Sequence, residues 1–219
     1  MFRFRPLLPG TTLADRLIAC AGAGIAIALT MVVCAGLPPL GPDLPVVVAP
    51  MGASAVLVFA VPTSPLAQPW PVVGGNILST LVGVAAAQAI PHVMVAAGVA
   101  VAGAILLMSL LRCLHPPGGA AALSAVIGGA GVHAAGYGFA FAPVGINSIA
   151  LVAIATVWHR TTLRRYPHRP AAVVPPGTLA PADIDAAIAD MHESFDIARA
   201  DLDALLAHAE RHAAARGKR

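Results

Sequence analysis

Long apolar runs, separated by short breaks rich in proline and glycine, occupy the first three quarters of this chain. Four runs approach the roughly 20 apolar residues that a helix needs to cross a bilayer: Leu17–Leu37, Val72–Ile90, Val93–Leu111 and Pro143–Trp158. Two shorter apolar segments, one from Met51 to the residue before Pro62 and one over Gly119–Gly131, predict helices of about half that length. The pattern predicts an all-α polytopic membrane protein with about six transmembrane segments.

Charged residues are nearly absent from the same region. Between Arg16 and Asp183 the only carboxylate is Asp43, and between Arg16 and Arg160 the only basic residue is Arg112. A soluble domain could not cover its surface with so few charges, so we expect a multi-pass protein of the cell inner (plasma) membrane. The basic residues at both ends predict that both termini are cytoplasmic. Six crossings place Arg112 on that side as well, whereas four full spans with two re-entrant segments would need another explanation for it.

The break His115-Pro116-Pro117-Gly118-Gly119 lies between two apolar runs, where an ordinary surface loop is not expected. Its prolines prevent a continuous helix, and the small residues after them can begin a new one. The first N–H groups of a helix have no partner within it, and they lie at the positive end of its dipole. The break therefore predicts an anion site, with a simple Pro-Gly kink between packed spans as the alternative.

A second break resembles the first, which indicates an internal repeat. Pro50–Ala55 matches Pro117–Ala122 at the proline, one glycine and two alanines, and Pro71–Asn76 resembles Pro143–Asn147. We expect two inverted three-helix repeats, at about residues 17–90 and 93–159, unless the similarity is chance in an Ala- and Gly-rich chain. Inverted repeats with broken helices place a binding site near the bilayer midplane, between the repeats.

The predicted site takes a small monovalent anion between the N-termini of the two short helices. Its candidate anion-binding residues are Pro50, Met51, Gly52, Ala53, Ser54, Asn76, His115, Pro117, Gly118, Gly119, Ala120 and Asn147. Asn76 and Asn147 are the only asparagines in the chain; they line the site or bond a neighbouring span. We expect no metal, no cofactor and no nucleic-acid partner.

The C-terminal region changes in character. A Pro-rich linker over residues 167–180 precedes a predicted cytoplasmic amphipathic helix over residues 181–216. Apolar residues there follow a heptad spacing typical of coiled coils: Ile184, Ile188, Met191, Phe195, Ala198, Leu202, Leu205 and Ala209. We expect a homodimer held partly by this helix; the alternative is a single helix packed on the membrane domain.

Several of these segments together resemble one known family. Pro50–Ala55, Ser64–Trp70, Gly74-Gly75-Asn76 and His115–Ala120 are similar to the HPP (His-Pro-Pro) integral membrane proteins. The resemblance covers roughly Leu13 to Tyr166, within a transmembrane domain that we place at residues 1–166. It implies a compact helical membrane domain and, from plant members, transport of nitrite into plastids.

Membrane transport of a small monovalent anion, with nitrite first among them, is therefore the expected function. An enzyme is not expected, because the apolar segments hold no evident nucleophile–base pair or metal cluster. The remaining alternative is a structural or signalling membrane anchor that acts through its C-terminal helix.

Overall fold

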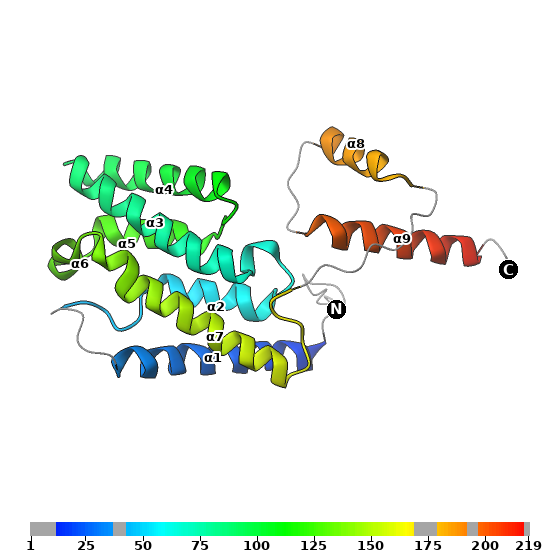
Figure 1. Ribbon diagram of the computed structural model, residues 1–219, viewed down its shortest axis with the longest axis horizontal. Coiled ribbons are helices and arrows are strands. Elements are labelled where there is room, and N and C mark those ends of the chain that lie inside the picture. The colour runs from blue at the N-terminus through cyan, green and yellow to red at the C-terminus, as the bar shows by residue number, and fades with distance from the viewer. Residues whose placement is uncertain (1–11, 37–42, 169–178, 192–196, 217–219) are drawn as a thin grey trace, which may run out of the picture.

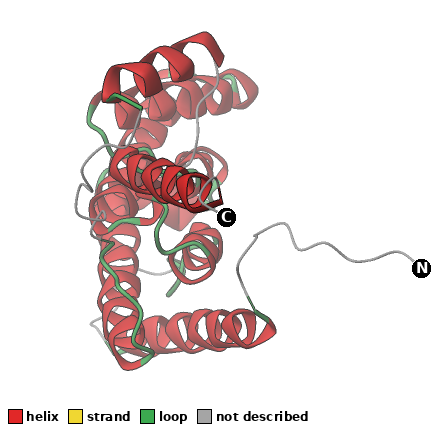
Figure 2. Ribbon diagram, turned by 90° about the vertical axis from the view of Figure 1, so that its right-hand side faces the viewer, coloured by secondary structure: helices red, strands yellow, loops and turns green. Residues whose placement is uncertain are grey.

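The computed structural model describes residues 12–36, 43–168, 179–191 and 197–216. The described residues form helices joined by turns and loops, without a β-strand (Figure 2). Three predicted features lie outside them in whole or in part: the end of the first span at Leu37, most of the linker at 167–180, and Phe195 of the heptad pattern.

Four helices in the described part of the chain are long and apolar enough to cross a membrane. They are α1 (Leu13–Ala35), α3 (Pro69–Ala89), α4 (Val93–Leu110) and a fourth that joins a π-helical turn, η2 (Ala140–Gly145), to α7 (Ile146–Thr161). Figure 1 shows these long helices running roughly along one direction, with the C-terminal helices beyond one end. The predicted all-helical, multi-pass membrane-protein class is confirmed, and the four long helices match the four long apolar runs; the count of six crossings stays a prediction.

The two remaining apolar helices are short, as the sequence predicts. Each has 11 residues: α2 is Pro50–Ala60 and α5 is Pro117–Ile127. Such a helix is about 17 Å long, roughly half of a hydrocarbon core. The bounds predicted for the second one are wrong, because proline fits the first turn of a helix and α5 starts there. A separate short helix, α6 (Ala130–Ala135), follows it.

The short helices lie in the interior of the bundle, between two pairs of long ones (Figure 1). One pair is α1 with α7, and the other is α3 with α4. α2 packs on α1 and α7, α5 packs on α3 and α4, and the two short helices also contact each other. Close approach depends on small residues: a Cβ at Gly83 of α3 would lie 2.3 Å from the Ala122 carbonyl oxygen of α5.

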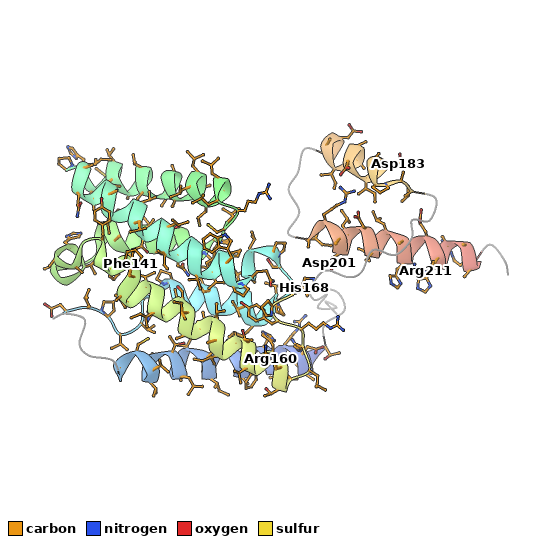
Figure 3. All side chains as sticks on the ribbon, viewed as in Figure 1. Phe141, Arg160, His168, Asp183, Asp201 and Arg211 are labelled. Carbon is orange, nitrogen blue, oxygen red and sulfur yellow. The ribbon has the colours of Figure 1, made fainter. Side chains whose placement is uncertain are left out.

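Side-chain contacts bring four helix termini to one end of the membrane domain. Arg164, which follows α7, forms a 2.6 Å ion pair with Asp15 in the first turn of α1. The start of α3 joins the end of α4 through a bond from Trp70 Nε1 to the Leu111 carbonyl (3.2 Å). Tyr166 donates to the carbonyl of Ala67 in η1 (Pro65–Ala67), next to the start of α3 (2.9 Å). We call this the tail end; Figure 3 labels Arg160 there and Phe141 toward the opposite end.

The start of α1 differs from the prediction because capping, not hydropathy, sets it. Thr12 accepts a bond from the backbone N–H of Asp15, and the Asp15 carboxylate accepts one from the N–H of Thr12. This capping box begins the helix at Leu13, four residues before the apolar run.

The predicted single C-terminal helix is wrong. The tail forms two helices, α8 (Pro181–Met191) and α9 (Arg199–Arg216), with a bend between them at Ile197. Arg199 joins them by binding Asp185 of α8, Asp203 of its own helix (2.7 Å) and the carbonyl of Pro181 (3.0 Å). The described residues of the heptad pattern are thus divided between two helices, which enclose an apolar groove of about 480 Å³.

His168 links the tail to the membrane domain. The His168 backbone N–H donates to Gln68 Oε1 (2.8 Å), and the His168 ring lies 2.7 Å from an Asp201 carboxylate oxygen of α9. Figure 3 labels His168 and Asp201 near each other, between the bundle and α9.

Candidate functional site

Five uncharged polar side chains lie inside the bundle, and all five are 0% exposed: Ser54, Asn76, Ser79, His115 and Ser148. Hydrogen bonds link four of them, and Ser79 lies one helical turn along α3 from Asn76. We call them the buried polar cluster. They come from α2, α3, the lead-in to α5, and α7, so both halves of the chain contribute. Polar groups in an apolar interior are costly unless they are hydrogen-bonded, so their partners decide what the cluster can do.

His115 bridges two distant segments. Its Nδ1 lies 2.8 Å from the carbonyl oxygen of Leu66, and its Nε2 lies 2.8 Å from Ser54 Oγ. A carbonyl can only accept, so Nδ1 carries a proton. In the neutral imidazole Nε2 is then an acceptor, and the Ser54 hydroxyl donates to it. A charged imidazole would need a carboxylate beside it. Asp43, the only carboxylate between Arg16 and Asp183, is exposed, so the neutral form fits this buried place.

Asn76 connects Ser54 to Ser148. Its Nδ2 lies 3.4 Å from Ser54 Oγ and 3.3 Å from Ser148 Oγ. The Ser148 hydroxyl donates to the Val144 carbonyl (2.8 Å), which leaves its oxygen free to accept from Asn76. Among the described residues, Asn76 Oδ1 has no hydrogen-bond partner although it is fully buried.

Ser79 is the second member of the cluster whose side chain lacks a partner within the described residues. It lies against the first turn of α5, where a Cβ at Gly118 would come within 2.6 Å of Ser79 Oγ and 2.9 Å of Met108 Sδ. Asn76 and Ser79 are three residues apart, so they share one face of α3. This face thus combines an unpartnered acceptor with an unpartnered hydroxyl.

The predicted free amides at the starts of the short helices are not present. In α2, the N–H of Met51 donates to the Val48 carbonyl (3.0 Å), and that of Gly52 to Ala49 (3.1 Å). In α5, the N–H of Gly118 donates to the His115 carbonyl (2.8 Å) and the N–H of Gly119 donates to Pro116 (3.1 Å). Tight turns ahead of both helices use these donors, so the helix starts do not form the predicted anion site by themselves.

Asn147 bonds the backbone that precedes α2 and lies outside the buried polar cluster. Its Oδ1 accepts from the backbone N–H of Val48 (2.9 Å), while its Nδ2 donates to the Val46 carbonyl (2.9 Å) and contacts Cys34 Sγ (3.1 Å). Asn147 therefore holds the non-helical lead-in to α2 (residues 43–49), and each of its amide atoms has a partner.

The structure brings together only part of the predicted set. Ser54, Asn76 and His115 lie in the cluster, Gly118 packs against it, and Met51 Sδ is 3.8 Å from Ser148 Oγ. The remaining predicted residues lie elsewhere: Pro50 and Pro117 are buried at the helix starts, Gly52, Ala53 and Ala120 are exposed, Gly119 is half-buried and faces open space, and Asn147 holds the lead-in to α2.

Two members of the cluster, Ser79 and Ser148, are absent from the predicted set. Ser79 follows Asn76 by three residues, which is a helical spacing that the sequence displays. Ser148 directly follows Asn147. Its role depends on which face of α7 meets α3, and the sequence alone does not determine that.

The Ser54–His115 pair has the distance of a nucleophile and its general base. Two features oppose catalysis there. The imidazole Nδ1–H is held by a neutral carbonyl instead of a carboxylate, and the nearby amides at the helix starts, which could stabilise an oxyanion, already have partners. Within the described residues, His, Cys, Asp and Glu side chains form no group of three that could hold a metal ion.

A cavity of about 380 Å³ lies at the end of the bundle opposite the tail end, between α3, α4, α5 and α6. Its lining is mainly apolar, with Gln88 and His133 as its polar side chains, and it includes no member of the buried polar cluster. Because its five side chains are 0% exposed, the cluster is closed to solvent in this conformation.

Comparison with known proteins gives a family and two relatives. The sequence model of one protein family, described as the HPP transmembrane region, matches residues 8–167. Two proteins of Dictyostelium discoideum, both named only as transmembrane proteins, are 41% identical over 121 residues and 39% identical over 120 residues. These alignments cover 53% and 52% of this chain but only 41% and 38% of the relatives. No solved structure matches the chain.

Proposed function

We propose that this chain, which belongs to the HPP family of transmembrane proteins, moves a small monovalent anion across the membrane, with nitrite as the expected substrate. The family resemblance implies this class of substrate, and the relatives' names add only that they are transmembrane proteins. The proposed route passes through the buried polar cluster rather than along the amide ends of the short helices.

The proposal depends on one observation: the buried polar cluster places uncharged polar atoms inside an apolar bundle. Five such side chains are fully buried together, and two of them, Asn76 and Ser79, lack a full set of partners among the described residues. Native interiors leave few polar atoms unpartnered, so a cluster of them indicates a ligand or water. A cluster with neither Asp nor Glu gives no preference to cations.

Packing supports six crossings in two inverted repeats, which belong to the proposal. The His159 ring bonds the Val58 carbonyl (3.0 Å), and Asn147 bonds Val48, so the lead-in and α2 run toward the tail end, parallel to α7. α5 runs the opposite way, from His115 near Leu66 toward the far cavity, which Val126 lines. The contacts also follow the repeat. If α1, α2 and α3 are exchanged with α4, α5 and α7, in that order, the same pairs of helices remain in contact. Each broken segment then crosses as extended chain plus a short helix.

The proposed orientation places the tail end in the cytoplasm of a cell whose inner (plasma) membrane holds the protein. Arg16, Arg112 and Arg160 all belong to helix termini at this end. Lys and Arg accumulate on the cytoplasmic side of membrane proteins. Both termini are cytoplasmic in this arrangement.

Gly118→Ala tests the route. A Cβ there would lie only 2.6 Å from Ser79 Oγ, so Ser79 or the start of α5 must shift beside the cluster. Displacing Ser79 or the start of α5 misplaces the cluster, so nitrite uptake into liposomes that contain the full chain is expected to fall at least about tenfold. Gly24→Ala in α1 is the matched control, because nothing lies within 4 Å of its Cβ position, and it is expected to match the wild type. Equal uptake by both variants, with both folded, would contradict the route.

Self-association through the tail is a separate proposal. The α8–α9 hairpin leaves an apolar groove lined by residues that include Ile184, Ile188 and Leu202, and Leu205 is 59% exposed. A second copy is the expected occupant, because its own hairpin supplies a matching apolar face and the two can form a four-helix bundle. Removing residues 178–219 is expected to halve the number of chains in each particle in detergent, measured by light scattering and corrected for the mass of the deleted residues. An unchanged mass would rule out this role, and uptake without self-association would leave the transport proposal intact.

An anchor that acts through its C-terminal helices is the alternative function. It predicts no uptake above that of protein-free liposomes for any anion, together with tail-dependent self-association.

A further inference from the structure

We infer that the buried polar cluster receives its substrate as the neutral, protonated acid and not as the anion. This inference rests on the proposed transport function and specifies which form of the substrate crosses. Its basis is the direction of the hydrogen bonds in the cluster, which leaves an acceptor where an anion would need a donor.

The bond directions follow from the two carbonyl groups at the ends of the network. Because the Leu66 carbonyl must accept from His115 Nδ1, the neutral ring accepts the Ser54 proton at Nε2. Because the Val144 carbonyl must accept from Ser148, that hydroxyl proton is also used. Both serine oxygens can then act only as acceptors toward Asn76.

The amide orientation of Asn76 is fixed by this result. Its NH₂ group must face Ser54 and Ser148, since a carbonyl oxygen placed there would meet two hydroxyl oxygens with no proton to share. Oδ1 therefore points away from both serines. It is a buried acceptor with no partner in the described part of the chain.

A bare anion would bind poorly beside Asn76 Oδ1. It offers only acceptors, and Oδ1 carries a partial negative charge, so the two would repel in a low-dielectric interior. The donors and cations that could counter this repulsion are occupied or distant. The amides at the helix starts are bonded to turn carbonyls, and Arg112 is exposed.

A protonated acid matches the cluster. Its O–H can donate to Asn76 Oδ1, and its second oxygen can accept from the Ser79 hydroxyl on the same face of α3. No bond to hydrogen breaks in this step: the proton enters and leaves with the anion, so each turnover moves one acid molecule and no net charge.

The test compares two weak acids with two strong ones in liposomes that contain the full chain. Nitrite and formate are the anions of weak acids, so a small fraction of each is protonated near neutral pH, whereas nitrate and chloride remain fully ionised. We expect protein-dependent uptake of nitrite and formate only, with acidification of the interior reported by a trapped pH dye and no response to an imposed membrane potential. Initial rates should rise about tenfold for each unit that the external pH falls, as the protonated fraction does. Uptake by protein-free liposomes is subtracted, because neutral acids also cross lipid.

Variants assign this behaviour to the cluster. Asn76→Leu removes the acceptor and is expected to reduce the protein-dependent uptake of both weak acids at least about tenfold, the change expected when a site loses a hydrogen-bond partner to a buried group. Ser79→Ala breaks no hydrogen bond in the described part of the chain, so it preserves the fold, and it is expected to reduce uptake several-fold. Thr30→Val is the matched control, since Thr30 Oγ1 is also buried and unpartnered but belongs to α1, outside the cluster. Its uptake should equal the wild type.

Each outcome has a separate meaning. Uptake of all four anions that responds to membrane potential would keep the transport function and overturn the acid-form inference. Weak-acid uptake that survives both Asn76→Leu and Ser79→Ala would also overturn it, leaving these atoms to a bound water. Absence of protein-dependent uptake for every anion would instead remove the proposed function itself.

Discussion

Gly83→Ala is expected to lower the free energy of unfolding of the membrane domain by about 3 kcal/mol, at the upper end of overpacking effects. The added Cβ would lie 2.3 Å from the Ala122 carbonyl oxygen and 2.9 Å from Ala122 Cα, both backbone atoms of α5. A flexible side chain could move aside, but this neighbour is a helix backbone that packs closely on α3. The helices must therefore separate, which also loosens the start of α5 beside the buried polar cluster.

The effect can be measured by thermal and denaturant unfolding in detergent micelles. Gly98→Ala is the matched control: it is also a glycine within a long helix, but nothing lies within 4 Å of its Cβ position. That variant is expected to be unchanged or stabilised by up to about 1 kcal/mol, because alanine has the higher helix propensity. Equal stability of the two variants would contradict the close contact of α3 and α5.

The apolar runs carry most of what the sequence can predict about this fold. Hydropathy identifies α4 almost to the residue, and the prolines at the starts of α2 and α5 indicate separate short helices. The errors occur where local hydrogen bonds decide. The Thr12–Asp15 capping box starts α1 early, and the bend at Ile197 divides a heptad pattern that reads as continuous. The pattern of apolar residues does not contain these bonds.

The candidate site, too, is predicted by residue type but corrected by local hydrogen bonds. Residue types predict a polar site at the breaks, and Ser54, Asn76 and His115 do meet there. Whether helix-start amides are free depends on the turn before the helix, and here carbonyls from these turns occupy them. The sequence also cannot separate Asn76 from Asn147, since the two occupy matching places in the repeat and differ only in the partners that the folded chain brings to them.

Asn147→Leu is expected to destabilise the protein by about 3 kcal/mol or more, whereas Asn76→Leu costs only about 1 kcal/mol. Leucine in place of Asn147 leaves the Val48 N–H and the Val46 carbonyl without their partner in the lead-in to α2. Unsatisfied backbone groups at membrane depth are especially costly, because lipid offers no replacement. At Asn76 the lost bonds are long, 3.3 and 3.4 Å, and Ser54 and Ser148 each keep another partner.

The two variants should therefore separate stability from transport. Unfolding midpoints in detergent are expected to fall strongly for Asn147→Leu and little for Asn76→Leu, while weak-acid uptake per folded molecule falls for Asn76→Leu. Asn147→Asp should also be strongly destabilised at neutral pH, because a carboxylate still accepts from the Val48 N–H but meets the Val46 carbonyl without a proton and carries an unpaired buried charge. If Asn147→Leu were as stable as the wild type, the lead-in to α2 would be held by other contacts. The matching repeat positions would then no longer divide into one structural and one substrate-binding asparagine.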